Sequence, residues 1–114
     1  MLTLEQFKAA RSVLRGVIRD TSLIPSTALS KSTGHNVYLK PENMQVTGAY
    51  KIRGAYYKIS TLSQEEKERG LITASAGNHA QGLAYAAQAA GVPATIVMPT
   101  TTPLVKVNNT KDYG

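Results

Sequence analysis

The 114 residues, enough for about one domain, are 42% hydrophobic and 18% charged, a balance typical of a folded chain that argues against disorder. The absence of cysteine excludes disulfides, thiol nucleophiles and cysteine-ligated metal sites, and two histidines are too few for most histidine-rich metal sites. No apolar run approaches the ~20 residues of a membrane span and the N-terminus lacks a signal peptide's apolar region, so we expect a soluble, cytoplasmic chain that does not bind membranes.

The first predicted helix begins near the N-terminus and ends near Arg19. Thr3 and Gln6 have the spacing of a capping box, and apolar residues then recur three and four positions apart up to Val17. Basic residues in the same stretch also recur at helical spacing: Lys8, Arg11, Arg15 and Arg19. This pattern indicates a solvated helix face, so we expect no nucleic-acid partner in spite of the net charge of +6.

The next segment, residues 20–35, is rich in turn-forming residues and shows no periodicity, so no regular element is predicted there. Residues 36–40 predict a short strand, because apolar side chains alternate along it and Pro41 ends it. Thr47 is expected to cap a following helix, since apolar residues lie at i, i+3, i+4 and i+7 over residues 52–59.

The most regular part of the chain is a strand–helix–strand unit. A short helix with a capping box precedes it at residues 63–70. The unit itself comprises a strand at 71–74, an alanine-rich helix at 78–90 and a strand at 94–98, and a further helix follows at 103–112. Connections this short predict a βαβ unit with parallel strands. Because only about three strands are visible, we expect an unfinished sheet in the N-terminal part of a larger α/β enzyme.

Lys51 is the first residue that suggests chemistry. It lies in the opening turn of a predicted helix, where free N–H groups and the helix dipole disfavour a positive charge, and Arg53 would add to this if it points the same way. A lysine with a destabilised ammonium is a better nucleophile, typically for a Schiff base with a carbonyl or with pyridoxal phosphate. An ordinary surface lysine is the alternative that local context favours.

Glu42 and Asn43 follow the strand predicted at 36–40 and could line the same pocket as Lys51, although a polar loop is the simpler interpretation.

The second candidate is the run Ser-Ala-Gly-Asn-His at residues 75–79, between a predicted strand and a predicted helix. Ligands bind at this place in α/β sheets, and free helix N–H groups favour an anion such as a carboxylate or a phosphate. Gly77 lets backbone approach a ligand closely, while Ser75 and Asn78 add side-chain donors. A plain helix cap is the alternative, and His79 alone is more typical of a packed helix residue than of a ligand.

Two stretches of sequence point to a family. They are KPENMQVTGAYKIRGA at residues 40–55 and TASAGNHAQG at residues 73–82. Together they closely resemble the threonine dehydratases, which are threonine ammonia-lyases of the pyridoxal-phosphate superfamily that contains tryptophan synthase β. The similarity extends over essentially the whole chain. It implies an α/β fold of three layers, in which a parallel sheet lies between flanking helices (fold type II), incomplete in this chain.

The resemblance also implies roles for individual residues. Lys51 matches the Schiff-base lysine that holds pyridoxal 5′-phosphate and moves protons at the substrate, and Tyr50 matches the aromatic residue that packs on the cofactor ring. Asn78 matches an asparagine that bonds to the cofactor's 3′-oxygen. The loop that holds the carboxylate of the amino-acid substrate is matched by Ser75, Gly77, Asn78 and His79. The implied reaction is dehydration and deamination of L-threonine, or of L-serine, to 2-oxobutanoate, or pyruvate, and ammonia.

Departures from the family pattern leave alternatives open. Related serine racemases place a serine acid/base at the position of Ala76, so alanine favours elimination, with a racemase-type relative as the alternative. The family's phosphate-binding glycine loop lies beyond residue 114, so we expect the chain alone to be inactive, a catalytically silent fragment. We expect residues 1–45 to belong to the large subdomain and 46–114 to the small one. The complete enzyme would be a homo-oligomer, a dimer or a tetramer, in isoleucine biosynthesis or threonine catabolism.

Overall fold

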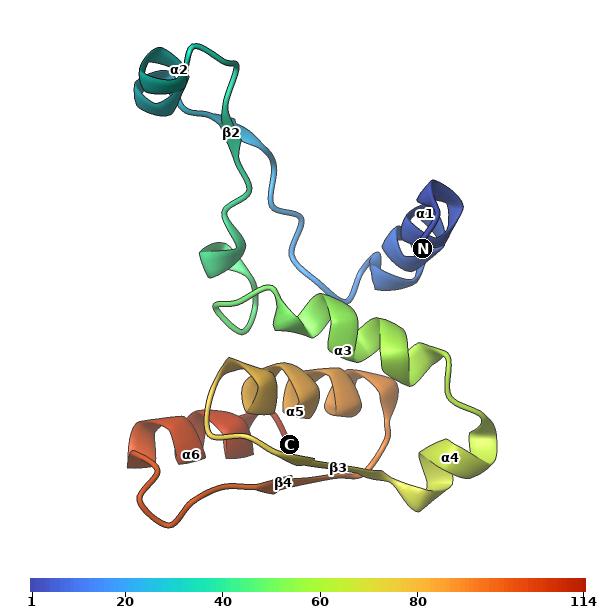
Figure 1. Cartoon of the computed structure of the whole chain (residues 1–114). Helices are drawn as coiled ribbons and strands as arrows, with labels where there is room; N and C mark the ends of the chain where they lie inside the picture. The colour runs from blue at the N-terminus through green and yellow to red at the C-terminus, as the bar shows by residue number, and fades with distance from the viewer.

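The computed structural model describes residues 1–114 as an α/β chain of six α-helices and four short strands (Figure 1). The helices are α1 (Leu4–Leu14), α2 (Thr27–Thr33), α3 (Lys51–Ser60), α4 (Gln64–Arg69), α5 (Asn78–Ala90) and α6 (Leu104–Asp112). The strands are β1 (Ile24–Pro25), β2 (Tyr38–Leu39), β3 (Leu71–Ala74) and β4 (Ala94–Val97), and a 3₁₀ turn covers Glu42–Met44. None of the helices is both long and apolar enough to cross a membrane.

Strands β3 and β4, with α5 between them in the chain, form the βαβ unit that the sequence predicts. The strands pair in parallel, from Leu71 opposite Ala94 to Ala74 opposite Val97. Helix α5 covers one face of the pair, where Leu71 and Ala94 pack against the core (Figure 1). The other face is open, and Ile72 on it is 76% exposed. The capping box before this unit is also confirmed, with both of its bonds present at the start of α4.

The core lies where α3 runs beside α5 (Figure 1). Ile59 of α3 packs with Ala86 and Ala87 of α5 and with Val92, and all four are buried. The alanine-rich face of α5 carries short side chains, so the two helices can approach each other closely and bury apolar surface between them. This pair of helices therefore determines where the residues at its ends are placed.

Helix α1 has the predicted capping box but is shorter than predicted. The N–H of Gln6 donates to Oγ1 of Thr3 at 3.3 Å, and the N–H of Thr3 donates to Oε1 of Gln6 at 2.8 Å. The helix ends at Leu14, because Arg15 has an extended ψ of 129° and Gly16 has a φ of +82°, which glycine adopts without strain. The prediction of a helix that continues beyond this point is wrong.

The segment 20–35, for which no regular element is predicted, contains β1 and α2. Strand β1 pairs with β2 in antiparallel fashion, with Ile24 opposite Leu39. The strand predicted at 36–40 therefore exists in shortened form, but it does not join the parallel sheet. Helix α2 begins after Ser26, which caps it, and ends at Gly34 with a φ of +71°. With β1 and β2 it forms an arm, residues 24–39, that projects away from α3 and α5 (Figure 1).

Candidate active site

Lys51 lies in the first turn of α3, as predicted, and is its first residue, but Thr47, the residue expected to cap this helix, does not cap it. Tyr50 occupies the N-cap position with a helical φ and ψ of −69° and −14°, and no side chain bonds to the first turn. Thr47 is 6% exposed and donates its hydroxyl to the carbonyl of Ala49 at 3.4 Å. Gly48, with a φ of +68°, turns the chain between Thr47 and the helix. The first N–H groups of α3 therefore have no side-chain partner beside Lys51.

The run at residues 75–79 leads from β3 into α5, as predicted. The N–H of Ser75 extends the strand pairing by donating to the last carbonyl of β4 at 3.0 Å, and Oγ of Ser75 accepts the N–H of Gly77 at 3.3 Å. No side chain caps α5, and a Cβ on Gly77 would meet no atom within 4 Å. Asn78 and His79 are exposed. The start of α5 thus presents donors to open space at the carboxyl end of the strands.

The two candidate stretches lie at the same end of the α3–α5 pair (Figure 1). The helices come very close at Gly82, in the second turn of α5: a Cβ there would lie 3.2 Å from the backbone nitrogen of Ile52 and 3.3 Å from the carbonyl carbon of Lys51. This contact joins the first turn of α3 to the early part of α5. The structure therefore places Tyr50 and Lys51 at the same end as the run 75–79.

The side chain of Lys51 lies beside Tyr50, with Nζ 5.2 Å from the centroid of the ring. Lys51 takes part in neither of the chain's two ion pairs. Arg53, which could have added its charge to that of Lys51, turns to Glu42 instead, because residues two apart on a helix point in different directions. The amine of Lys51 is thus left without an acidic partner.

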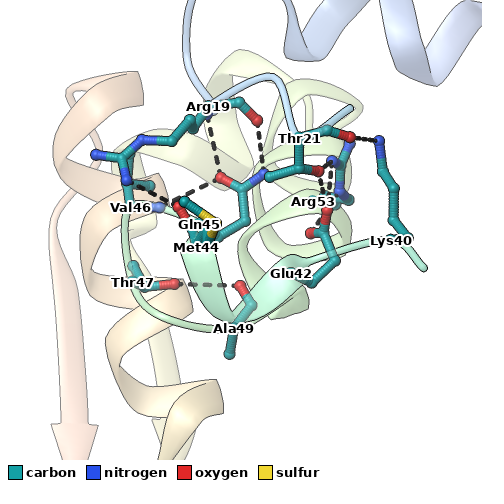
Figure 2. Close-up of polar contacts among 10 residues, drawn as sticks. All are labelled: Arg19, Thr21, Lys40, Glu42, Met44, Gln45, Val46, Thr47, Ala49 and Arg53. Carbon is teal, nitrogen blue, oxygen red and sulfur yellow. Dashed lines mark hydrogen bonds and ion pairs between the residues drawn. The ribbon is translucent and has the colours of Figure 1, made fainter. Parts of the chain in front are cut away.

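Glu42 and Arg53 form an ion pair with two hydrogen bonds (Figure 2). Nε of Arg53 donates to Oε2 of Glu42 at 2.8 Å, and Nη2 donates to Oε1 at 2.7 Å. Thr21 donates its hydroxyl to Oε1 of Glu42 at 2.5 Å, and Nζ of Lys40 donates to the carbonyl of Thr21. The interpretation of Glu42 as a residue of a polar loop missed this network, which links α3 to the chain that follows α1.

The ion pair predicts a defined pH dependence of stability. The bonds from Arg53 and, after them, from Thr21 hold the pKa of Glu42 at about 2, below its ordinary value of 4.5. A carboxyl with a lowered pKa in the folded state stabilises the fold above its ordinary pKa and loses that contribution as the pH falls toward 2. In urea titrations at stepped pH, the free energy of unfolding should therefore fall more steeply between pH 4.5 and 2 in the native chain than in Glu42→Gln. Parallel curves would contradict this assignment.

Gln45 is a second residue whose role the sequence analysis missed (Figure 2). Its Oε1 accepts the N–H of Arg19 at 3.1 Å, and its Nε2 donates to the carbonyl of Arg19 at 2.7 Å. Gln45 is 4% exposed, so these bonds are shielded from water. Nη1 of Arg19 in turn donates to the carbonyl of Met44 at 2.9 Å. The chain after α1 is therefore fastened to the start of the loop that leads to Lys51.

A cavity of about 720 Å³ lies elsewhere, between α1 and the side of α3 that carries Arg53. Apolar and basic side chains line it, among them Phe7, Leu14, Arg11 and Arg15. None of the residues proposed from the sequence for cofactor or substrate binding lines this cavity. The predicted site lies instead at the shared start of α3 and α5.

Comparisons with known proteins identify several that are similar to this chain. A family model described as pyridoxal-phosphate dependent enzyme matches residues 14–114. The chain is 55% identical over 114 residues to a curated L-threonine ammonia-lyase from Thermotoga maritima and covers 28% of it. A serine racemase structure from Dictyostelium discoideum matches with a TM-score of 0.90 and 36% identity, over 99% of this chain and 37% of that one. The structure of the processed form of threonine deaminase isoform 2 from Solanum lycopersicum matches with a TM-score of 0.80 and 42% identity, over 100% of this chain and 32% of that one.

The chain thus spans between 28% and 37% of the length of these proteins. The family match includes both Lys51 and the run 75–79. The α/β fold with an incomplete parallel sheet, expected from the sequence, is confirmed by the solved neighbours. The chain belongs to the pyridoxal-phosphate-dependent enzymes of fold type II.

Proposed function

We propose that this chain is the N-terminal part of a threonine dehydratase, which converts L-threonine to 2-oxobutanoate and ammonia and acts in the same way on L-serine. The observation that carries the proposal is a lysine amine without an acidic partner at the start of α3, beside the uncapped start of α5. The name of the Thermotoga maritima relative, an L-threonine ammonia-lyase, supports the choice of substrate. We assign the complete enzyme to the cytoplasm, in isoleucine biosynthesis or threonine catabolism.

The residues present at this end of the helix pair fit pyridoxal phosphate. The amine of Lys51 would hold the cofactor covalently through its aldehyde carbon. Tyr50 is 61% exposed and offers a ring face against which an aromatic cofactor can stack. Asn78, the first residue of α5, is exposed and carries an amide that can donate to an oxygen on the ring. An amine, an aromatic face and an amide donor are thus offered at one end of the pair.

The start of α5 suits the carboxylate of the amino-acid substrate. The positive end of the helix dipole and the N–H groups of Asn78 and His79 favour an anion. The hydroxyl of Ser75 accepts the N–H of Gly77 and can still donate its own proton. Pyridoxal phosphate, when bound, supplies the electron sink for the pair released at the substrate's α-carbon. Lys51 would take the proton from that carbon and return it to the departing group or to the product.

A serine racemase-type reaction is the second candidate, because a solved serine racemase matches this chain with a TM-score of 0.90. Racemisation needs a proton donor on each face of the α-carbon. Ala76, half-buried in the turn between β3 and α5, has no group that can hold a proton. This observation favours elimination over racemisation.

The chain covers only part of the length of its relatives, and this affects the activity that we expect from the chain alone. It spans about a third of its relatives, and we propose that residues 1–45 belong to a large subdomain and 46–114 to a small one. We further propose that the complete enzyme is a dimer or a tetramer, and that the chain alone is catalytically silent. The exposed face of β3 and β4, which includes Ile72, supports the view that further structure is needed to enclose the site.

A chimera tests this proposal. The chain replaces the matching segment of the Thermotoga maritima relative, and the products are measured in the presence of pyridoxal phosphate. We expect 2-oxobutanoate from L-threonine and pyruvate from L-serine, without D-serine, while the chain alone releases neither keto acid. D-serine as the main product would instead support the racemase-type reaction. A folded chimera that binds the cofactor but forms none of these products would contradict both candidates.

A further inference from the structure

We propose that Glu42 is a positioning residue for Lys51. Through its ion pair with Arg53, it closes the segment 42–53 into a ring of backbone and side chains and so fixes the loop that leads into α3. The inference rests on the proposed function, in which Lys51 supplies the reacting amine. Glu42 bonds to Arg53 and Thr21 and to neither Lys51 nor the run 75–79, so its action would pass through the loop.

The loop in question, residues 46–50, has few bonds of its own. Its only backbone–backbone bond within the turn joins the N–H of Gly48 to the carbonyl of Gln45 at 2.8 Å. Three side-chain bonds add to it: the hydroxyl of Tyr113 donates to the carbonyl of Val46 at 3.2 Å, the N–H of Val46 donates to Oε1 of Gln45 at 3.3 Å, and the hydroxyl of Thr47 donates to the carbonyl of Ala49 at 3.4 Å. Irregular segments with so few backbone bonds are usually mobile unless other contacts restrain them. Lys51 follows this loop directly. Contacts that restrain the loop therefore also restrain the backbone that carries the amine.

The two residues of the ion pair flank the loop in the sequence. Glu42 precedes the loop, Arg53 follows Lys51 by two residues, and the two partners are 11 residues apart. Two parallel bonds between a guanidinium and a carboxylate restrict direction as well as distance. The pair is also shielded, because the side chains of Arg53 and Glu42 are 29% and 17% exposed. It therefore differs from a solvated surface pair, which contributes little to order.

The ring is tied to the chain that follows α1 (Figure 2). Thr21 is 3% exposed and bonds to both partners, at 2.5 Å to Oε1 of Glu42 and at 3.3 Å from Nη2 of Arg53. Lys40 donates to the carbonyl of Thr21 from the same side. The carboxylate of Glu42 thus lies between two cations and a buried hydroxyl. Its loss would open the ring, leave Arg53 without its ion-pair partner and remove the bond that Thr21 donates to Glu42.

Amide hydrogen exchange on the whole chain tests the inference without any cofactor. In Glu42→Gln we expect the amides of Gly48 and Arg53 to exchange about tenfold faster, because a charge-assisted bond across the loop is lost, while those of the buried part of α5 are unchanged. Arg53→Lys, which keeps the charge but loses the two-bonded geometry, should act in the same direction and decides the case if Glu42→Gln does not fold. Equal acceleration in α5, or none at Gly48, would overturn the inference.

The matched control is Glu65→Gln, which removes the exposed pair with Arg69 on α4, 3.9 Å apart and with side chains that are 82% and 68% exposed. It should leave amide exchange at Gly48 unchanged.

A second readout is the ratio of borohydride-fixed pyridoxal phosphate on Lys51 to that on the exposed Lys58. We expect Glu42→Gln to lower this ratio severalfold, and an unchanged ratio would overturn the link to the amine. If Lys51 is not preferred in the native chain, the chain alone does not form a cofactor site, and the exchange data still decide whether Glu42 orders the loop. The proposed function is decided separately, by the products of the chimera.

Discussion

Lys51→Ala should abolish the adduct that borohydride fixes between pyridoxal phosphate and the peptide around residue 51. The reason is that Lys51 lies at the shared start of α3 and α5, with its amine beside the ring of Tyr50 and at the same end of the helix pair as the run 75–79. In the chimera with the Thermotoga maritima relative, loss of the group that moves the α-proton should lower the rate of 2-oxobutanoate formation by about 10²–10⁴-fold or more. Peptide mass spectrometry and a keto-acid assay measure the two effects.

Lys58→Ala is the matched control for this variant. Lys58 lies in the last turn of the same helix and is exposed, so its removal changes the net charge equally without touching the site. We expect its adduct at Lys51 and its rate in the chimera to equal those of the unmodified chain. Cofactor-dependent product from Lys51→Ala at the native rate would mean that another amine carries the reaction, and would remove the basis of the proposed site.

The parts of the fold that could be predicted from the sequence are those that depend on local signals. The capping boxes that begin α1 and α4 require only residues three apart, and both are present. The βαβ unit follows from two short apolar runs, a helix between them and turn residues at each junction, and its strands pair in parallel. Gly91, which ends α5 with a φ of +65°, is another local signal of this kind. The placement of Lys51 and Asn78 at helix starts was predictable for the same reason.

The contacts that order the site are non-local, and the sequence does not reveal them. Gln45 bonds to Arg19, which is 26 residues away, and Tyr113 bonds to the carbonyl of Val46, which is 67 residues away. A glutamine in a loop is usually solvated, so no periodicity marks it as buried. The sequence predicts that Arg53 adds its charge to that of Lys51 only if both side chains point the same way, and this direction depends on the partner that the tertiary fold supplies, here Glu42.

Short elements escaped prediction for a different reason. Helix α2 has seven residues and no buried side chain, so it cannot show the apolar stripe from which helices are recognised. The pairing of β1 with β2 involves two residues in each strand, fewer than alternation needs to become visible. The residue type and place of Thr47 predict a helix cap, yet Gly48, with a φ of +68°, turns the chain between Thr47 and α3, and Tyr50 takes the N-cap position. At Thr47, therefore, backbone geometry overrode the residue preference.

Gly82→Ala should destabilise the chain even though alanine is the better helix former. In a helix interior this exchange usually stabilises by about 0.5–1 kcal/mol, because glycine loses more backbone freedom on folding. Here the new Cβ would lie 3.2 Å from the nitrogen of Ile52 and 3.3 Å from the carbonyl carbon of Lys51. Ile52 is fully buried, so α3 can relieve the contact only by moving as a unit. Such overpacking costs about 1–3 kcal/mol, so urea denaturation should show a net loss of stability.

Gly54→Ala provides the matched control, because Gly54 is also inside a helix but its Cβ would meet no atom within 4 Å. It should raise the free energy of unfolding by about 0.5–1 kcal/mol, so the two glycines are expected to differ in sign. A change of the same sign in the free energy of unfolding at both positions would mean that α3 moves easily to make room for the new Cβ.

Because the crowded atoms belong to Lys51 and Ile52, Gly82→Ala should also lower adduct formation at Lys51 under conditions where the variant is still folded. Loss of stability without that change would show that the separation of α3 and α5 does not place the amine.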